Sequence, residues 1–347
     1  MTAEALPSAE AARWTAEALP SGRRIALVGT PRDLDALTPL RAAYAGAGIE
    51  EAVLALRPGR ELADVPPTAL RQVAEDVDAV LLVYPRRFAP RTVADGPTLQ
   101  TRRGRHVPLG LVPAGAGTLE TFAVAAAGVH TRSAAHGVLS VALLAQRSRR
   151  YADLAGRIRR SLHDGIDNSA HTAVSAVFWW PAEAMVRDDL ITGLGHGVGL
   201  AVYLGHGRPK GWVGYGGVQA HHLAGGEPVA MVVSLACHTL SRRHTGLAFA
   251  EALVTTGSAS ASLGATTSTP HVANARWSLR LVDALATGPR TSGDLIVAAA
   301  PEGSLSVRYR LIGDPLAPLL DAPGAREAAR ALTDDVTLTP TPQEEAA

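Results

Sequence analysis

Short apolar runs alternate with amphipathic segments along most of the chain, and this pattern is typical of α/β proteins. In the first third, the predicted strands lie at residues 24–29, 52–56, 79–84 and 108–112, and the predicted helices at residues 34–47, 68–75 and 119–129. Residues 85–107 show no clear periodicity. Alternation of this kind predicts a parallel sheet with helices packed on it.

The second part of the chain alternates more regularly. Its predicted strands lie at residues 138–145, 173–179, 199–204, 229–235 and 259–265, and its predicted helices at residues 151–164, 181–194, 246–256 and 274–287. A glycine-rich loop at residues 205–217 interrupts this order, and residues 311–319 close the domain.

Length and punctuation divide the chain into four predicted parts. A chain of 347 residues fits about two domains. We expect a flexible leader at residues 1–22, an N-terminal α/β subdomain at residues 23–135, a larger α/β domain at residues 136–320, and a helical and disordered tail at residues 321–347. The larger α/β domain is where the candidate chemistry lies.

Composition excludes several classes of function. The chain is 47% hydrophobic and 19% charged, with a mean hydropathy of +0.10, so most of it can form a packed core. A formal net charge of +1 provides no broad cationic field, which argues against nucleic acid as a partner. Residues 1–10 lack a basic and apolar signal, and no apolar run reaches the roughly 18 residues of a membrane helix. We therefore expect a cytoplasmic protein with no membrane partner.

One cysteine and one histidine follow consecutive predicted strands. Cys237 is the single cysteine and comes directly after the apolar run 229–235, and His206 lies between two glycines after the strand at 199–204. If the two strands pair in parallel, both side chains reach the same edge of the sheet, where open α/β sheets place their active sites. Thiol and imidazole together are the groups of nucleophilic catalysis.

Several segments resemble the catalytic segments of the gingipain-type cysteine peptidases. The resemblance is carried by residues 203–207, Trp212, residues 234–237, 249–253, 257–264 and 311–315. It implies a caspase-like (caspase-hemoglobinase) α/β fold, with a mostly parallel sheet flanked by helices and preceded by a smaller α/β subdomain. It also implies a cysteine endopeptidase that cleaves protein or peptide substrates through a thioester, without a cofactor or metal.

The resemblance assigns roles to individual residues. Cys237 is the expected nucleophile, His206 the acid/base, and the backbone N–H groups of Gly207 and Cys237 the oxyanion hole. The family's acidic residue that orients the histidine has three candidates, Asp164, Asp167 and Asp189, and remains unassigned.

Four further residues are candidates for substrate binding. Trp212 either lines the substrate groove or packs the glycine-rich loop onto the domain. Thr266, Thr267 and Ser268 follow the strand at 259–265 and either form a wall of the specificity pocket or a solvated strand end.

Alternative interpretations remain open. Cys237, His238, His244 and the pair at 221–222 could suggest a metal site, but their spacing fits no zinc pattern. The glycines at 193–199 precede a strand, which indicates a helix-ending turn and not a dinucleotide site. A CHAT-type peptidase in a bacterial signalling or defence system is a close alternative. The last is a non-catalytic caspase-like module that binds a regulatory protein.

Overall fold

The computed structural model describes residues 22–56, 67–132, 138–168, 174–301, 303 and 306–338. Apart from Gly22, the predicted leader lies outside the described residues, as does the end of the predicted tail. Within the described ranges, every helix falls short of the length and apolar character that a membrane crossing needs.

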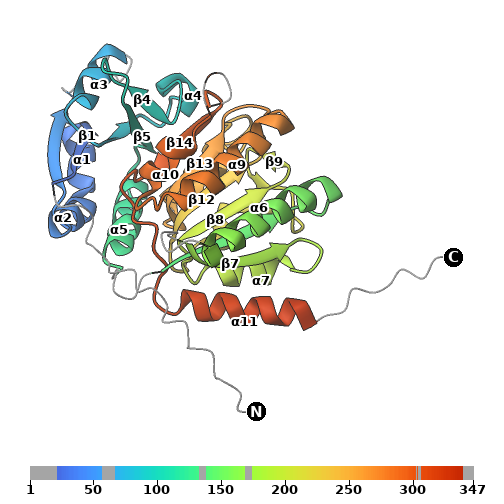
Figure 1. Ribbon diagram of the computed structural model, residues 1–347. Coiled ribbons are helices and arrows are strands. Elements are labelled where there is room, and N and C mark those ends of the chain that lie inside the picture. Colours follow the sequence, from blue (N-terminus) through green and yellow to red (C-terminus); the bar gives the residue numbers. More distant parts are fainter. Residues whose placement is uncertain are drawn as a thin grey trace.

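A single mixed sheet runs through both predicted halves of the chain (Figure 1). In spatial order its strands are β2 (Glu50–Ala55), β1 (Arg24–Gly29), β3 (Ala79–Tyr84), β5 (His106–Pro113), β14 (Tyr309–Gly313), β13 (Ala259–Ala265), β12 (Val229–Leu235), β8 (Leu200–Leu204), β6 (Leu139–Ala145) and β7 (Val174–Pro181). The short β4 (Thr98–Gln100) pairs antiparallel with β5. Along the spatial order all neighbours are parallel except β13 and β14, so strand direction reverses at that pair.

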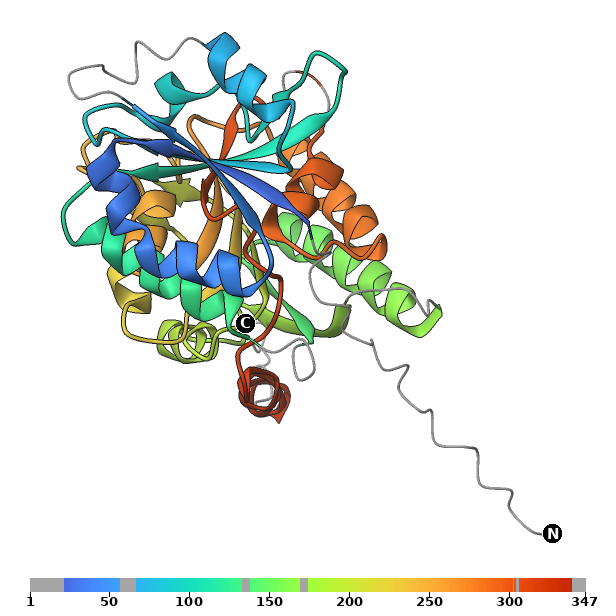
Figure 2. The same cartoon turned by 90° about the vertical axis from the view of Figure 1, so that its left-hand side faces the viewer.

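Helices cover both faces of the sheet (Figure 2). One layer holds α6 (Arg149–Asn168), α9 (His271–Ala286) and α10 (Ser292–Ala299). The other holds α1 (Pro31–Ala36), α2 (Thr38–Gly46), α5 (Thr118–His130), α7 (Arg187–Leu194), α8 (Phe249–Thr255) and α11 (Ala325–Leu338). The remaining helices are α3 (Pro67–Ala74), which packs against β4, and α4 (Pro90–Val93).

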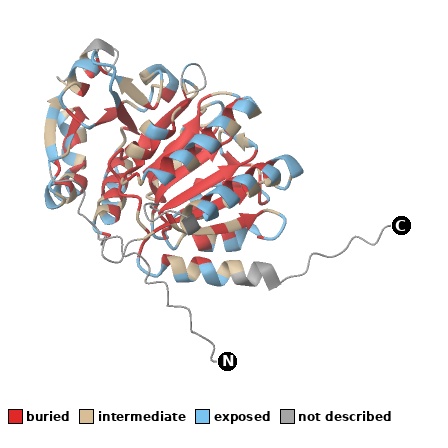
Figure 3. Cartoon of the chain, viewed as in Figure 1, coloured by how far each residue is buried: buried red, intermediate tan, exposed pale blue. Residues whose placement is uncertain are grey.

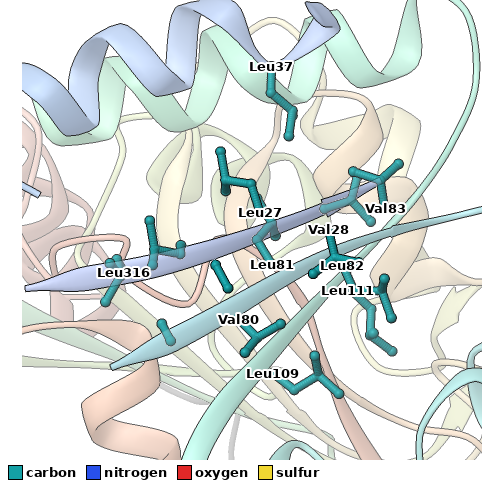
Figure 4. Close-up of a cluster of buried hydrophobic side chains, with 14 of the residues drawn as sticks. Leu27, Val28, Leu37, Val80, Leu81, Leu82, Val83, Leu109, Leu111 and Leu316 are labelled. Atoms are coloured by element: carbon teal, nitrogen blue, oxygen red, sulfur yellow. The ribbon is translucent and has the colours of Figure 1, made fainter. Parts of the chain in front are cut away.

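The central strands consist almost entirely of apolar and small residues because both of their faces are covered. Every residue of β3, β6, β8, β12 and β13 is buried, as the continuous red strands of Figure 3 show. In the N-terminal half, leucines and valines of β1, β3 and β5 pack together beneath Leu37 (Figure 4). This burial explains why the strands were predictable from their hydrophobic runs.

The predicted helices differ from the observed ones at prolines. The predicted helix at 34–47 is two helices, because Pro39 is tolerated only in the first turn of a helix and α2 begins beside it. The predicted helix at 181–194 begins only at Arg187, since Pro181 still belongs to β7.

The prediction missed α10, although Thr291 and Asp294 form a capping box at its start.

The reversal at β14 depends on close contacts between backbones. Gly313 has a φ of +92°, and a Cβ on Gly110 would lie 2.2 Å from the carbonyl oxygen of Gly313. Asp314 follows and is fully buried. Its carboxylate accepts a hydrogen bond from the Tyr44 hydroxyl at 2.7 Å and lies 2.7 Å from Nε2 of His130. This carboxylate therefore ties α2 and α5 to the central sheet, and it raises the pKa of Tyr44 in addition to burial.

We predict that Asp314→Ala lowers the free energy of unfolding by about 2–5 kcal/mol, because Tyr44 and His130 lose their buried partner. Asp153→Ala is the matched control: its exposed pair with Arg149, at 3.9 Å, contributes about 0.5 kcal/mol or less. Urea unfolding followed by circular dichroism measures both variants. If the two substitutions lowered the free energy of unfolding equally, the claim that Asp314 ties α2 and α5 to the sheet would be contradicted.

Candidate active site

The strands that carry the candidate chemistry are parallel neighbours. In the β8–β12 pair Leu204 lies opposite Leu235, and His206 and Cys237 each follow two residues later. The predicted pairing is confirmed, and both residues leave the same, carboxyl edge of the sheet.

The backbone of His206 is fixed from three sides. Its N–H donates to Oε1 of Gln146 at 2.6 Å, and its carbonyl accepts from the Tyr203 hydroxyl and the Val213 N–H, both at 3.0 Å. A Cβ on Gly205 would lie 2.3 Å from that same hydroxyl, so only glycine fits there. The imidazole itself is on an exposed residue and projects from this rigid turn.

Tyr151 contacts the ring of His206. Its ring, in the first turn of α6, meets the His206 ring edge-on, with centroids 5.5 Å apart. Burial raises the pKa of Tyr151, and negative charge on Cys237 raises it further. The Tyr151 ring also meets the ring of His271, with centroids 6.0 Å apart, and the pKa of His271 is lowered by burial and then by Arg150. Tyr151 is thus a neighbour of His206 that responds electrostatically to Cys237.

Cys237 is half-buried, and its sulfur faces a hydrogen-bond donor. The backbone N–H of Thr269 donates to Sγ at 3.3 Å, and the Thr269 hydroxyl lies 3.5 Å away. A donor in this position stabilises negative charge on sulfur once the thiolate forms. Below it, Asn274 donates to the carbonyl of Leu235 at 3.0 Å and accepts from the Tyr309 hydroxyl, which braces the end of β12.

The two segments meet at Gly207. A Cβ on this residue would lie 2.4 Å from the carbonyl oxygen of Cys237, so the two backbones are in direct contact. The structure therefore brings together the residues of the predicted oxyanion hole, and any side chain at Gly207 would push them apart.

Trp212 lies in the core, only 2% exposed. Its indole stacks on Tyr203 at 4.6 Å, meets Phe249 edge-on at 5.2 Å, and donates from Nε1 to Oγ of Ser234 at 2.9 Å. These contacts support its predicted role in packing the glycine-rich loop, and Trp212 also contributes to the lining of a neighbouring cavity.

The three residues of the predicted pocket wall differ in how far they are exposed to solvent. Thr266 is buried and bonds through its hydroxyl to the carbonyl of Arg308, whose guanidinium donates to the carbonyl of Ser268 at 2.6 Å. Thr267 is half-buried and Ser268 is exposed. The Ser268 hydroxyl lies 2.8 Å from Nε2 of His238, so that imidazole is engaged with the wall.

Sequence reasoning missed the group that anchors the loop after Cys237. Glu251 is fully buried and accepts from Nε of Arg242 at 2.8 Å, from the Tyr84 hydroxyl, and from the N–H of Ala248 at 2.8 Å. A glutamate within an apolar helix start was the available signal, because a carboxylate is rarely buried without a partner. The pairing secures the loop against the N-terminal half.

The acidic partner of His206 remains open. Asp164 and Asp189 are both exposed, and the side chain of Asp167 lies outside the described residues. Among the carboxylates that the structure describes, none hydrogen-bonds the His206 ring, whose described contact is with Tyr151. Likewise, the described histidines, cysteine and carboxylates include no group of three that could hold a metal ion.

The fold has counterparts among solved structures. The Arg-specific cysteine proteinase gingipain R superposes with a TM-score of 0.64 at 15% identity, over 86% of this chain and 78% of that one. A complex of the pro- and mature domains of Porphyromonas gingivalis RgpB gives 0.59 at 14% identity, over 86% and 80%. A structure described only as a protease gives 0.61 at 14%, over 85% and 78%. These likenesses confirm the predicted caspase-like α/β fold.

Sequence comparison identifies the family directly. None of the curated proteins matches the chain. The model of peptidase family C25 matches residues 146–320, which is half of the chain and includes both His206 and Cys237. This chain therefore belongs to peptidase family C25, the gingipain-type cysteine peptidases predicted from its sequence.

Proposed function

We propose that Cys237 is the nucleophile and His206 the general acid/base of this cysteine endopeptidase. One observation carries the proposal: both residues stand two positions beyond a matched pair of neighbouring parallel strands, Leu204 and Leu235. Such a register sets thiol and imidazole at one level of the sheet edge, where a peptide bond can lie between them.

In the first step, the thiolate of Cys237 attacks the scissile carbonyl carbon and forms a carbon–sulfur bond. The carbonyl oxygen becomes an oxyanion, which the N–H groups of Gly207 and Cys237 stabilise. As the carbon–nitrogen bond breaks, the imidazolium of His206 gives its proton to the leaving amine. The product is a thioester on Cys237 and a free amine.

In the second step, the neutral imidazole of His206 takes a proton from water, and the resulting hydroxide attacks the thioester. The carbon–sulfur bond breaks and the thiolate is restored. Gln146, Tyr203 and Tyr151 act as positioning residues throughout, because they contact the backbone and the ring of His206.

The substrate of this peptidase is a protein or peptide, as its family implies. A protein partner that regulates access to the site is a further proposal. It is supported by the likeness to a structure in which a mature peptidase domain is bound to its pro-domain.

We predict different losses for the two members of the dyad. Cys237→Ala removes the sulfur that bonds to substrate, so peptide hydrolysis should fall to background. His206→Ala should lower kcat/KM by about 10²–10⁴-fold, the usual contribution of general acid/base assistance. Hydrolysis of a mixed peptide library, followed by mass spectrometry, identifies cleaved peptides and then provides the substrate for kinetics.

His196→Ala is the matched control, since His196 is exposed and precedes β8 at its opposite end. This variant should hydrolyse peptides within about twofold of the parent, as surface substitutions rarely disturb a fold. Near-native turnover by a folded His206→Ala variant would refute the assignment.

We also predict independence from transition metals, because thiol and imidazole supply all the proposed chemistry. Peptide hydrolysis should persist in a zinc-selective chelator and disappear after alkylation of the single cysteine with iodoacetamide. Loss of activity in chelator that returns on addition of zinc would favour a metallohydrolase instead.

A further inference from the structure

A cavity of about 500 Å³ lies beside the proposed dyad. One wall comes from residues 208–213, which follow His206, and the other from His238 and residues 243–245, which follow Cys237. The volume is in the range of pockets that hold a side chain or small ligand. Neither His206 nor Cys237 lines the cavity, but one wall begins two residues after His206 and the other includes the residue directly after Cys237.

The walls of this cavity carry charge of one sign. Arg208, Lys210 and Arg243 provide three permanent positive charges, His238 and His244 add imidazoles, and no aspartate or glutamate lies among the lining residues. Lys210 is also the one lysine of the 347-residue sequence. A concave site lined by one sign of charge attracts the opposite charge.

None of these three cations forms an ion pair within the part of the chain that the structure describes. Among the described residues, no carboxylate lies within ion-pair distance of Arg208, Lys210 or Arg243. The neighbouring Arg242 differs, since it is paired with the buried Glu251 and its side chain is only 12% exposed. The adjacent arginines therefore have different roles. Arg242 holds the loop, whereas Arg243 lines the cavity, where its Nε donates to Nε2 of His244 at 3.3 Å and it has no described carboxylate partner.

The cavity is held in shape by its supports. Arg208 and Gly211 pair across a tight hairpin with Pro209 and Lys210 at its tip, and the carbonyl of Pro209 accepts from the N–H of Phe249 at 2.8 Å. The buried indole of Trp212 anchors the base of this hairpin. A pre-formed pocket loses little freedom on binding.

Residues with strained backbone conformations lie at the cavity and beside it. Among the described residues, the non-glycine residues with positive φ are Tyr215, His238 and His244, at +59°, +59° and +62°. Two of them line the cavity, and Tyr215 lies in the glycine-rich loop that borders it. Strained conformations persist where the surrounding structure holds them, and they are common at ligand sites.

We propose that this cationic pocket selects substrates by binding a carboxylate side chain, aspartate or glutamate, within about three residues of the cleaved bond. An extended peptide rises about 3.3 Å per residue, so such a side chain reaches the cavity while the scissile bond lies at Cys237. The inference rests on the proposed function and adds the substrate class. The peptidase prefers acidic sequences.

Paired peptides test this selectivity. A cleaved peptide from the library is remade with glutamate or glutamine at each of the three positions on either side of the bond. At one position, glutamate should raise kcat/KM by about 10-fold over glutamine, as expected for several partly exposed charge pairs acting together. This ratio should shrink as salt is raised, because exposed charges are screened.

Variants that remove positive charge from the cavity test whether the cavity causes the preference for glutamate. The double variant Lys210→Gln with Arg243→Gln should bring the glutamate-to-glutamine ratio close to 1, and Lys210→Glu should lower it further. Arg330→Gln is the matched control, an exposed arginine on α11, and should keep the ratio of the parent protein.

The single lysine allows the same test without mutation. Acetylation removes the charge of Lys210, whereas reductive methylation keeps it; both reagents also modify the α-amino group, whose charge acetylation removes as well. The acetylated protein should show a ratio about two- to fivefold lower than the methylated protein.

The possible outcomes are distinct. If the parent protein cleaves neither member of any pair and no library peptide, the proposed function fails. If it cleaves both members equally at all six positions, or if the preference survives in the double variant, the proposed function stands and the binding of acidic side chains by the cationic pocket is refuted.

Discussion

The parallel pairing of β8 with β12 is the constraint on which the site depends. A one-residue slip would turn His206 and Cys237 to opposite faces of the sheet, because successive side chains alternate. The register is held by burial, since every residue of both strands is inside the core and each is covered on both faces. The chemistry at the edge is thus a consequence of packing in the middle of the sheet.

Around this strand pair, buried polar groups fix the helices, loops and turns that surround the sheet. Asp314 joins α2 and α5 to the sheet, and Glu251 anchors the loop after the nucleophile through Arg242. Tyr203 and Gln146 hold the turn that carries His206. Each of these groups has at least one partner that is distant in sequence, so the site is assembled from segments that only the complete fold brings together.

The sequence predicted the strands most accurately, and it predicted least well the residues that hold the active-site segments in place. Strands 24–29, 79–84, 229–235 and 259–265 match the structure residue for residue, because apolar runs covered on both faces leave a strong signal. The dyad candidates followed from strand order. The contact of Tyr151 with His206 and that of Glu251 with Tyr84 could not be predicted in this way, since both join segments distant in sequence. The two-strand hairpin at Arg208 and Gly211 was also hidden inside a segment that composition describes only as glycine-rich.

The most direct test of this account is the rate at which a peptidyl acyloxymethyl ketone labels Cys237 in the native chain. The account predicts a single adduct on the cysteine-containing peptide, formed at least about 100-fold faster than on the chain unfolded in urea, because the folded site orients the carbonyl and supplies the proton. Labelling of the native chain no faster than of the unfolded chain would contradict it, since Cys237 would then be an ordinary thiol.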